Sequence, residues 1–210
     1  MSREEFLGRW DLLPDLKFAE LIRGVVHMPS PLSLSHGGLD GDVGMVVGLY
    51  AHNTPGCQRL QCASWLILGS VPQPDVSLRI RPEFGGRSGQ RGALAAGVPE
   101  LVVEVSVSSE SFDLGEKKSF YVEAGVLEYI VVVAGSRVVW HRLDAGRYID
   151  VPADADGIYR SIIFPGLWLD PKALLAGDGR RLVDVLNKGL TTPEHAAFVE
   201  KLAAQKRGNG

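Results

Sequence analysis

Apolar positions along this chain repeat with two different periods. Between residues 39 and 52, apolar side chains recur mainly at intervals of three and four residues, which predicts an amphipathic helix. Elsewhere, short apolar runs bounded by glycine, proline and aspartate predict β-strands. The expected strands cover residues 22–28, 60–68, 75–80, 101–107, 129–133, 137–143, 147–151 and 159–164.

Further helices are expected before, between and after these strands. Residues 18–21 predict a short helical start, and the Asp113-x-x-Glu116 spacing of a capping box predicts a helix over about 113–124. Near the end of the chain, Leu182, Val183, Leu186 and Leu190 form one apolar stripe, and Thr192-Pro193 opens a last helix. Residues 81–97, rich in glycine and arginine, are expected to form a loop.

This order of elements predicts a mixed α/β (α+β) fold. We expect a mixed central sheet flanked by helices, an antiparallel extension formed by the strands between residues 129 and 164, and helices at the C-terminus. The length of 210 residues suits one domain with a small appendage, which we place at 1–176 and 177–210. The 25 glycines argue against a helical bundle.

Charge and composition restrict which kinds of partner the protein can bind. With 22 basic and 25 acidic groups, the formal net charge of −3 excludes a protein that coats nucleic acid by overall charge, so any such contact must be local. No uncharged run predicts a membrane span or an export signal, and we expect a cytoplasmic protein with no membrane partner. Cys57 and Cys62 are more readily explained as reduced thiols than as a bridge or a metal site.

Several common catalytic motifs are absent. The sequence has no Gly-x-x-x-x-Gly-Lys phosphate loop, no Gly-x-Gly-x-x-Gly, no Gly-x-Ser-x-Gly and no His-Glu-x-x-His. The remaining candidates for catalytic groups are carboxylates and a lysine.

Two carboxylates stand out by their place on predicted strands. Alternation puts Asp75 on the face of its strand opposite the apolar side chains, and it puts Glu104 in the middle of an apolar strand. A buried carboxylate needs a cation, a hydrogen-bond donor or a water-filled cleft. One explanation is a plain ion pair between Glu104 and an arginine on a neighbouring strand.

The following helix offers a second explanation. Lys117 lies at the centre of its apolar sector, with Glu116 and Glu123 on the opposite side. A lysine on the buried side of this helix, just after a strand that carries an inward carboxylate, predicts an acid–lysine site. The alternative is a structural salt bridge between Lys117 and Glu104.

These residues carry a resemblance to a known family. Pro74-Asp75, Glu104 and Lys117 resemble the PD-(D/E)XK nuclease superfamily, although Ser106 occupies the usual place of the lysine, two residues after the second acid. The segments 97–106 (GVPELVVEVS), 113–117 (DLGEK) and 124–129 (AGVLEY), together with Tyr121, look like the Uma2 family of putative restriction endonucleases, in which the following helix supplies the lysine. The resemblance covers about residues 18–175 and implies a restriction-endonuclease-like core.

The resemblance implies a metal-dependent endonuclease that hydrolyses phosphodiester bonds of nucleic acid, with DNA expected. Asp75 and Glu104 would hold Mg²⁺, with Mn²⁺ as a substitute, and Lys117 would orient the attacking water or neutralise developing charge. Glu20 resembles an early acidic residue of the superfamily that assists the metal; a solvent-facing helix carboxylate is the alternative.

Other residues are assigned binding or supporting roles. Arg79, Arg81, Arg87 and Arg91 would form a local positive wall for nucleic acid, or else a solvated surface and loop. His36, Tyr121 and Glu128 match further family positions. For His36 the alternative is a role in starting a helix or packing a loop, and for Glu128 it is stabilising a turn.

Two expectations concern assembly and activity. Duplex cleavage needs two active sites. The apolar faces of the final helices, over 182–190 and 198–203, also exceed what a single small sheet edge would need for its cover, so we expect a homodimer. The alternative to an enzyme is a catalytically inactive relative that keeps the fold and binds nucleic acid or protein.

Overall fold

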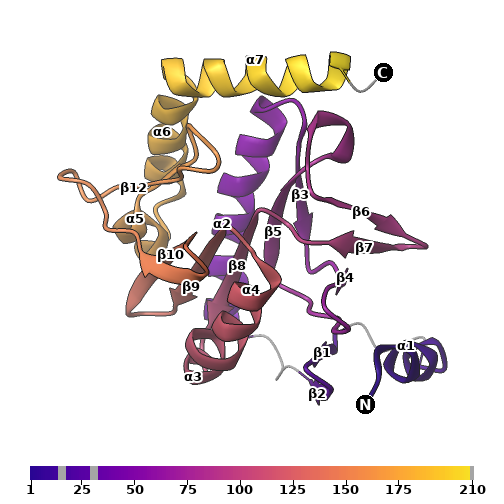
Figure 1. The fold of residues 1–210 in the computed structure, drawn as a ribbon. Helices are drawn as coiled ribbons and strands as arrows, with labels where there is room; N and C mark the ends of the chain where they lie inside the picture. The colour runs from indigo at the N-terminus through magenta and orange to yellow at the C-terminus, as the bar shows by residue number, and fades with distance from the viewer. Residues whose placement is uncertain (14–17, 29–32, 209–210) are drawn as a thin grey trace.

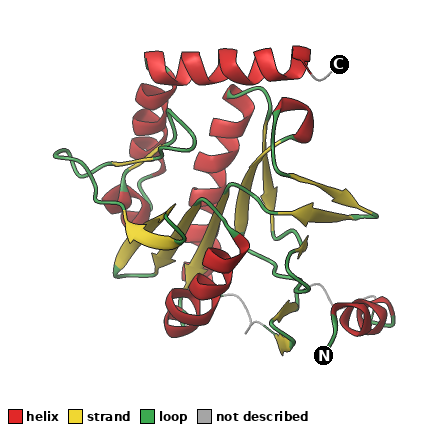
Figure 2. Cartoon of the chain, viewed as in Figure 1, coloured by secondary structure: helices red, strands yellow, loops and turns green. Residues whose placement is uncertain are grey.

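The computed structural model of the chain describes residues 1–13, 18–28 and 33–208 (Figures 1 and 2). Its helices are α1 (Arg3–Asp11), α2 (Leu34–Asn53), the 3₁₀ turn η1 (Pro82–Phe84), α3 (Glu110–Phe112), the π-helical turn η2 (Asp113–Lys117), α4 (Lys118–Ala124), α5 (Pro171–Ala176), α6 (Gly179–Leu190) and α7 (Pro193–Gly208). Its strands are β1 (Glu20–Ile22), β2 (Val25–His27), β3 (Cys57–Gln61), β4 (Trp65–Leu66), β5 (Val76–Ile80), β6 (Ser88–Arg91), β7 (Leu94–Gly97), β8 (Leu101–Ser106), β9 (Glu128–Val133), β10 (Arg137–Asp144), β11 (Arg147–Asp150), β12 (Tyr159–Arg160) and β13 (Trp168–Leu169).

A six-stranded mixed sheet forms the centre of the fold. Its strand order is β11-β10-β9-β8-β5-β3, with β8 and β9 parallel and every other neighbouring pair antiparallel. The predicted mixed sheet with an antiparallel extension is therefore confirmed. The segment that links the parallel pair contains α3, η2 and α4, as a crossover between parallel strands requires.

Helices cover both faces of the sheet, and alternate residues of each strand face different layers. Val103 of β8 packs in the main core cluster with Val43 and Val47 of α2. Its neighbour Val102 packs on the other face with Phe120 of α4. The side that a strand residue faces can therefore be read from alternation, as the sequence indicated.

Three segments between residues 60 and 164 differ from their predicted structure. The strand expected at 60–68 is divided between β3 and β4, which belong to different sheets. Residues 81–97 are not one loop: they form η1 and the β6–β7 hairpin, which joins β4 in a small three-stranded sheet. The strands of this hairpin carry small and polar side chains, such as Gly89 and Ala96, so they lack the apolar alternation that marks a strand. The strand expected at 159–164 is also shorter, because only β12 forms and it pairs with β13 outside the main sheet.

The N-terminal region also departs from expectation. The helical start predicted at 18–21 is wrong, because Glu20 begins β1, which pairs with β2 across a turn at Arg23 and Gly24. Both turn residues have positive φ, +48° and +84°, as the tight turns of β-hairpins require. Helix α1 was not expected, because Phe6 is its only buried residue and no apolar stripe marks it.

The C-terminal helices pack against the rest of the chain. Leu182 and Leu186 of α6 and Phe198 and Leu202 of α7 belong to the main core cluster, and Figure 1 shows α7 lying across one end of the molecule. Their apolar faces are thus buried within the monomer, which removes one of the two reasons for expecting a homodimer; the other, that duplex cleavage needs two active sites, is unaffected. The dimer and the boundary after residue 176 stay predictions. No helix among the described residues has the length and apolar character to cross a membrane.

Candidate active site

Asp75 and Glu104 lie opposite one another on neighbouring strands. The β5–β8 register pairs Val76 with Val103, and one further step along both strands places Asp75 opposite Glu104. The backbone N–H of Val105 donates a hydrogen bond to Asp75 Oδ2 over 2.7 Å. The two carboxylates therefore share one face of the sheet, at the point where β5 begins.

Glu104 is 4% exposed and has two partners from the following helix. The hydroxyl of Tyr121 donates to Glu104 Oε1 over 3.1 Å, and Lys117 Nζ lies 2.9 Å from the same oxygen. The cation beside Glu104 is thus Lys117 and not an arginine on a neighbouring strand.

The segment that carries Lys117 is helical in an unusual way. The helix begins at α3 rather than at Asp113, so the predicted capping box is wrong: Asp113 is buried and accepts a hydrogen bond from Ser109 Oγ over 2.6 Å. From Asp113 to Lys117 the chain forms the π turn η2 before α4 continues. Single π turns inside helices frequently mark functional sites, because the wider turn changes the direction of the side chains that follow.

Glu20 joins the same cluster from the N-terminal hairpin. Its Oε1 lies 3.0 Å from Lys117 Nζ, and its side chain is 12% exposed. Glu20 is therefore held inside the site on strand β1, not on a solvent-facing helix. Lys117 is bound between Glu20 and Glu104, so the N-terminal hairpin and the β8–η2 segment, which are far apart in the sequence, meet at one ammonium group.

The site carries an excess of negative charge. Among the described residues, the carboxylates that raise the pKa of Glu104 are Asp75, Asp113 and Glu20, and the cation that opposes them is Lys117. Burial raises the pKa of Glu104 well above its ordinary value, and Lys117 offsets only part of that rise. Burial lowers the pKa of Lys117, but Glu104 and Glu20 raise it by more, so the lysine stays charged.

The donor set suits a hard divalent cation. The described residues include no group of three or more His, Cys, Asp and Glu side chains placed to hold a metal. Magnesium, however, usually takes one or two carboxylates from a protein and completes its shell with water. Asp75 and Glu104 supply two carboxylates on adjacent strands, and a cation there would relieve the uncompensated charge of the cluster.

His36 connects helix α2 to this site. Its backbone N–H donates to Ser33 Oγ over 3.1 Å, so it belongs to the capped first turn of the helix. Its ring Nε2 also lies 3.6 Å from Asp75 Oδ1, and the nearby Asp75 carboxylate raises the pKa of the imidazole. His36 therefore lies both in the first turn of α2 and beside Asp75, so its position fits a helix-start residue and a site residue alike.

The four arginines of the expected positive wall lie on β5, beside η1, and in or next to β6, the first strand of the β6–β7 hairpin. Arg79 donates to Gln58 Oε1 and to the carbonyl of Gly89, and Arg87 lies 3.5 Å from Glu100. Arg81 lies 4.0 Å from Glu83, and Arg91 is exposed. The structure gives three of them protein partners, and their role in nucleic-acid binding stays a prediction.

Glu128 lies outside the site. It pairs with Leu101 at the opposite end of β8 and is fully buried. Its carboxylate accepts from Ser161 Oγ over 2.6 Å and from the backbone N–H of Ile162 over 3.0 Å. These contacts fix the segment that precedes β13, in line with the interpretation of Glu128 as a residue that stabilises a turn.

Because Glu128 has this structural role, its substitution should change stability and not activity. We expect Glu128→Ala to lower the free energy of unfolding by about 2 kcal/mol, because it leaves the buried hydroxyl of Ser161 and the partly buried N–H of Ile162 without their acceptor. Burial raises the pKa of Glu128 above its ordinary 4.5, so its contribution to stability is present at low pH and is lost as pH rises through the raised pKa. Urea unfolding at pH 5 and pH 8, with the isosteric Glu128→Gln as control, measures both effects.

In Glu128→Gln the free energy of unfolding should fall less between pH 5 and pH 8 than in the wild type, because the amide does not ionise. A larger loss in the variant would contradict the assigned cause.

One further residue of the cluster was not predicted as part of it. The Asp113-x-x-Glu116 spacing predicts a helix cap, but Asp113 is buried and its charge acts on Lys117. Its spacing of four residues from Lys117, which places both on one side of a helix, was the signal that could have indicated it. The structure brings together Glu20, Asp75, Glu104, Lys117 and Tyr121; their catalytic roles stay predictions.

Comparison with known proteins identifies a family and a similar fold. The family model Uma2, described as "Putative restriction endonuclease", matches residues 3–172. The fold is similar to the crystal structure of a putative nuclease belonging to DUF820 from Anabaena variabilis ATCC 29413, with a TM-score of 0.63 and 14% sequence identity over 84% of this chain and 98% of that one. No curated protein matches the chain.

Proposed function

Because this chain belongs to the Uma2 family of putative restriction endonucleases, we propose that it is a metal-dependent endonuclease that hydrolyses phosphodiester bonds of DNA. The observation that carries the proposal is the pairing of Asp75 with Glu104 across β5 and β8, with the ammonium of Lys117 2.9 Å from Glu104. Two carboxylates beside a charged lysine are the side chains that this hydrolysis needs.

Asp75 and Glu104 would hold Mg²⁺, or Mn²⁺ in its place. The bound ion would supply Lewis-acid stabilisation of the phosphate and would lower the pKa of a water molecule. The protein already orients both carboxylates, because the N–H of Val105 fixes Asp75 Oδ2 and the hydroxyl of Tyr121 fixes Glu104 Oε1. Such fixed ligands need little rearrangement when a cation binds.

Lys117 would act on the water or on the phosphate. Its position between Glu20 and Glu104 keeps it charged and directs it at the carboxylate pair. A fixed positive charge in a site with little water stabilises the negative charge that develops on a phosphate under attack. In this account Glu20 positions Lys117, and His36 positions Asp75 from the side of α2. Cleavage of both strands of a duplex needs two such sites, so we propose a homodimer as the acting form.

The test is a cleavage assay on plasmid DNA. We expect nicked and linear products with Mg²⁺ or Mn²⁺, and none with EDTA or Ca²⁺. Single-stranded DNA and RNA tested in parallel would identify the preferred substrate. No cleavage of any of the three in Mg²⁺ or Mn²⁺ would contradict the proposal and would favour the alternative of a catalytically inactive binding protein.

A further inference from the structure

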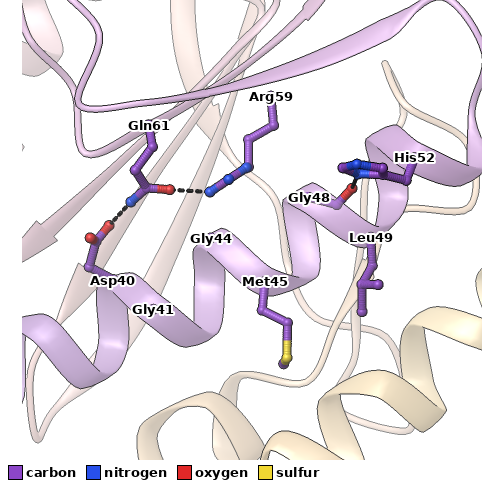
Figure 3. A pocket seen from close by; sticks show the side chains of 9 residues that line it. All are labelled: Asp40, Gly41, Gly44, Met45, Gly48, Leu49, His52, Arg59 and Gln61. Atoms are coloured by element: carbon purple, nitrogen blue, oxygen red, sulfur yellow. Dashed lines mark hydrogen bonds between the residues drawn. The ribbon is translucent and has the colours of Figure 1, made fainter.

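Strand β3 forms one edge of the six-stranded sheet. Its inner side pairs with β5, and no described strand pairs with its outer side. A cavity of about 510 Å³ lies beside this edge, between β3 and α2, and Figure 3 shows the nine residues that line it. Gln61 lines the cavity and pairs with Val76 of the main core cluster, so the cavity lies on the α2 face of the sheet. The carboxylate pair lies on the opposite face.

Alternate residues of β3 direct their backbone groups toward the free edge. The N–H of Cys62 donates to the carbonyl of Asp75 over 2.9 Å, so Cys62 and, by alternation, Leu60 direct their backbone groups to β5. The N–H and C=O groups of Arg59 and Gln61 therefore point away from β5, to the outer side. Backbone groups at such an edge are a template on which another strand can pair.

The strand lacks the features that usually protect a sheet edge. Proteins protect edges with lysine, proline or exposed charges, and the opposite edge, β11, carries exposed Arg147 and Asp150. Strand β3 (CQRLQ) has no lysine or proline, and its arginine lies against α2. A Cβ atom on Gly48 would lie 3.3 Å from Arg59 Nε, so the glycine lets the arginine fold onto the helix and away from the edge. The edge is thus open to a partner strand.

The charges beside this edge are arranged so that two copies complement one another. The guanidinium of Arg59 donates to Gln61 Oε1, and Gln61 Nε2 donates to Asp40 Oδ1 over 2.5 Å, which places Asp40 at the Gln61 end (Figure 3). A two-fold axis at Leu60 would place Arg59 of each copy opposite Gln61 of the other, and hence near Asp40 of the other. An axis at Arg59 would instead place two arginines opposite each other, where like charges repel.

We propose that two copies of this chain pair through β3, antiparallel about Leu60, and join their six-stranded sheets into one. Arg59 and Gln61 would exchange backbone hydrogen bonds across the axis, and Arg59 of each copy would face Asp40 of the other. The axis of such a pair is perpendicular to the sheet, so both carboxylate sites would face the same side, on the order of 20 Å apart. The inference rests on the proposed function for the need for two sites, and it gives the homodimer proposed there an interface.

The first test measures the association state by sedimentation velocity, in EDTA and without DNA. The wild type should be a dimer at micromolar concentration. Arg59→Glu and Asp40→Lys should each weaken the dimer by at least about a hundredfold, because a symmetric dimer of either variant contains two like-charge contacts. Arg147→Glu makes the same kind of change at the opposite edge of the sheet and is the control, which should remain dimeric.

Mixing the two charge-reversal variants tests whether the contact is between chains. A heterodimer of Arg59→Glu with Asp40→Lys has opposite charges at both contacts, so the mixture should form a dimer although neither variant does so alone. A contact within one chain cannot be restored in this way. Circular dichroism shows whether each variant is folded. If either charge reversal does not fold, the milder Arg59→Gln and Asp40→Asn should each weaken the dimer about tenfold.

Three results would overturn the inference: a monomeric wild type, a dimer that the folded variants leave intact, or a mixture of folded charge-reversal variants that stays monomeric. A monomeric wild type would leave a strand of another protein as the alternative occupant of the edge. The assay contains neither DNA nor metal, so its result is independent of cleavage. Cleavage by a monomeric wild type would leave the nuclease without this interface, and a dimer with the expected charge dependence but no cleavage would leave the interface without the nuclease.

Discussion

Glu104→Gln should abolish DNA cleavage while the protein remains folded. The substitution keeps the shape of the side chain and its contact with Tyr121 but removes a metal-binding charge, so we expect the cleavage rate to fall by about a thousandfold or more. The free energy of unfolding should change by no more than about 1 kcal/mol without metal, because burial already raises the pKa of Glu104 and disfavours its charge. Rates of plasmid nicking in Mg²⁺ and urea unfolding in EDTA measure the two effects.

A matched variant separates this effect from a general loss of acidic charge. Glu123→Gln makes the same change at an exposed position of α4, where the side chain pairs with Arg23. It should cleave DNA at the wild-type rate. If Glu104→Gln retained more than about a tenth of wild-type activity, Glu104 would not be an essential metal ligand.

Lys117→Met should lose most cleavage and much stability, and the loss of stability should depend on pH. We expect the rate to fall by at least about a hundredfold, since a charge aimed at the reacting phosphate is removed. Without metal, the free energy of unfolding at pH 8 should fall by about 3 kcal/mol, because ionised Glu104 and Glu20 lose the cation between them.

The direction of the pH effect follows from Glu104. Its pKa in the folded protein is raised, and removal of Lys117 raises it further. A carboxyl with a raised pKa in the folded state contributes stability at low pH that is lost as pH rises through that pKa. Lys117→Met should therefore be closer to the wild type in stability at pH 5 than at pH 8. Urea unfolding at both pH values, with Lys118→Met as control, tests this. If Lys117→Met cleaved DNA at the wild-type rate, the role of Lys117 would be reduced to a structural salt bridge with Glu104 and Glu20.

Part of the site could be predicted because local periodicity determines it. Alternation of side chains in a strand placed Asp75 and Glu104 on one sheet face, and the structure confirms that placement through the β5–β8 register. Helical periodicity placed Lys117 on the side that faces the sheet. The π turn shifts the details of that helix but leaves Lys117 buried.

Other parts depend on contacts between distant segments and left no local pattern. Glu20 reaches Lys117 only because the β1–β2 hairpin folds beside the helix, and the hairpin strands are three residues each, too short to show a period. The apolar stripe of α6 was recognised in Leu182 and Leu186, although Val185 and not Val183 is buried. Periodicity does not tell whether such a stripe packs within the chain or against a second copy.

The most direct test of the central claim is a calorimetric titration of Mn²⁺ into the wild type, Glu104→Gln and Lys117→Met. If Asp75 and Glu104 hold the ion and Lys117 acts on the water or phosphate, the wild type should bind Mn²⁺ and Glu104→Gln should not. Lys117→Met should bind it at least as tightly as the wild type, because a positive charge beside the carboxylates is gone. Identical weak binding in all three proteins would contradict a metal site at these carboxylates.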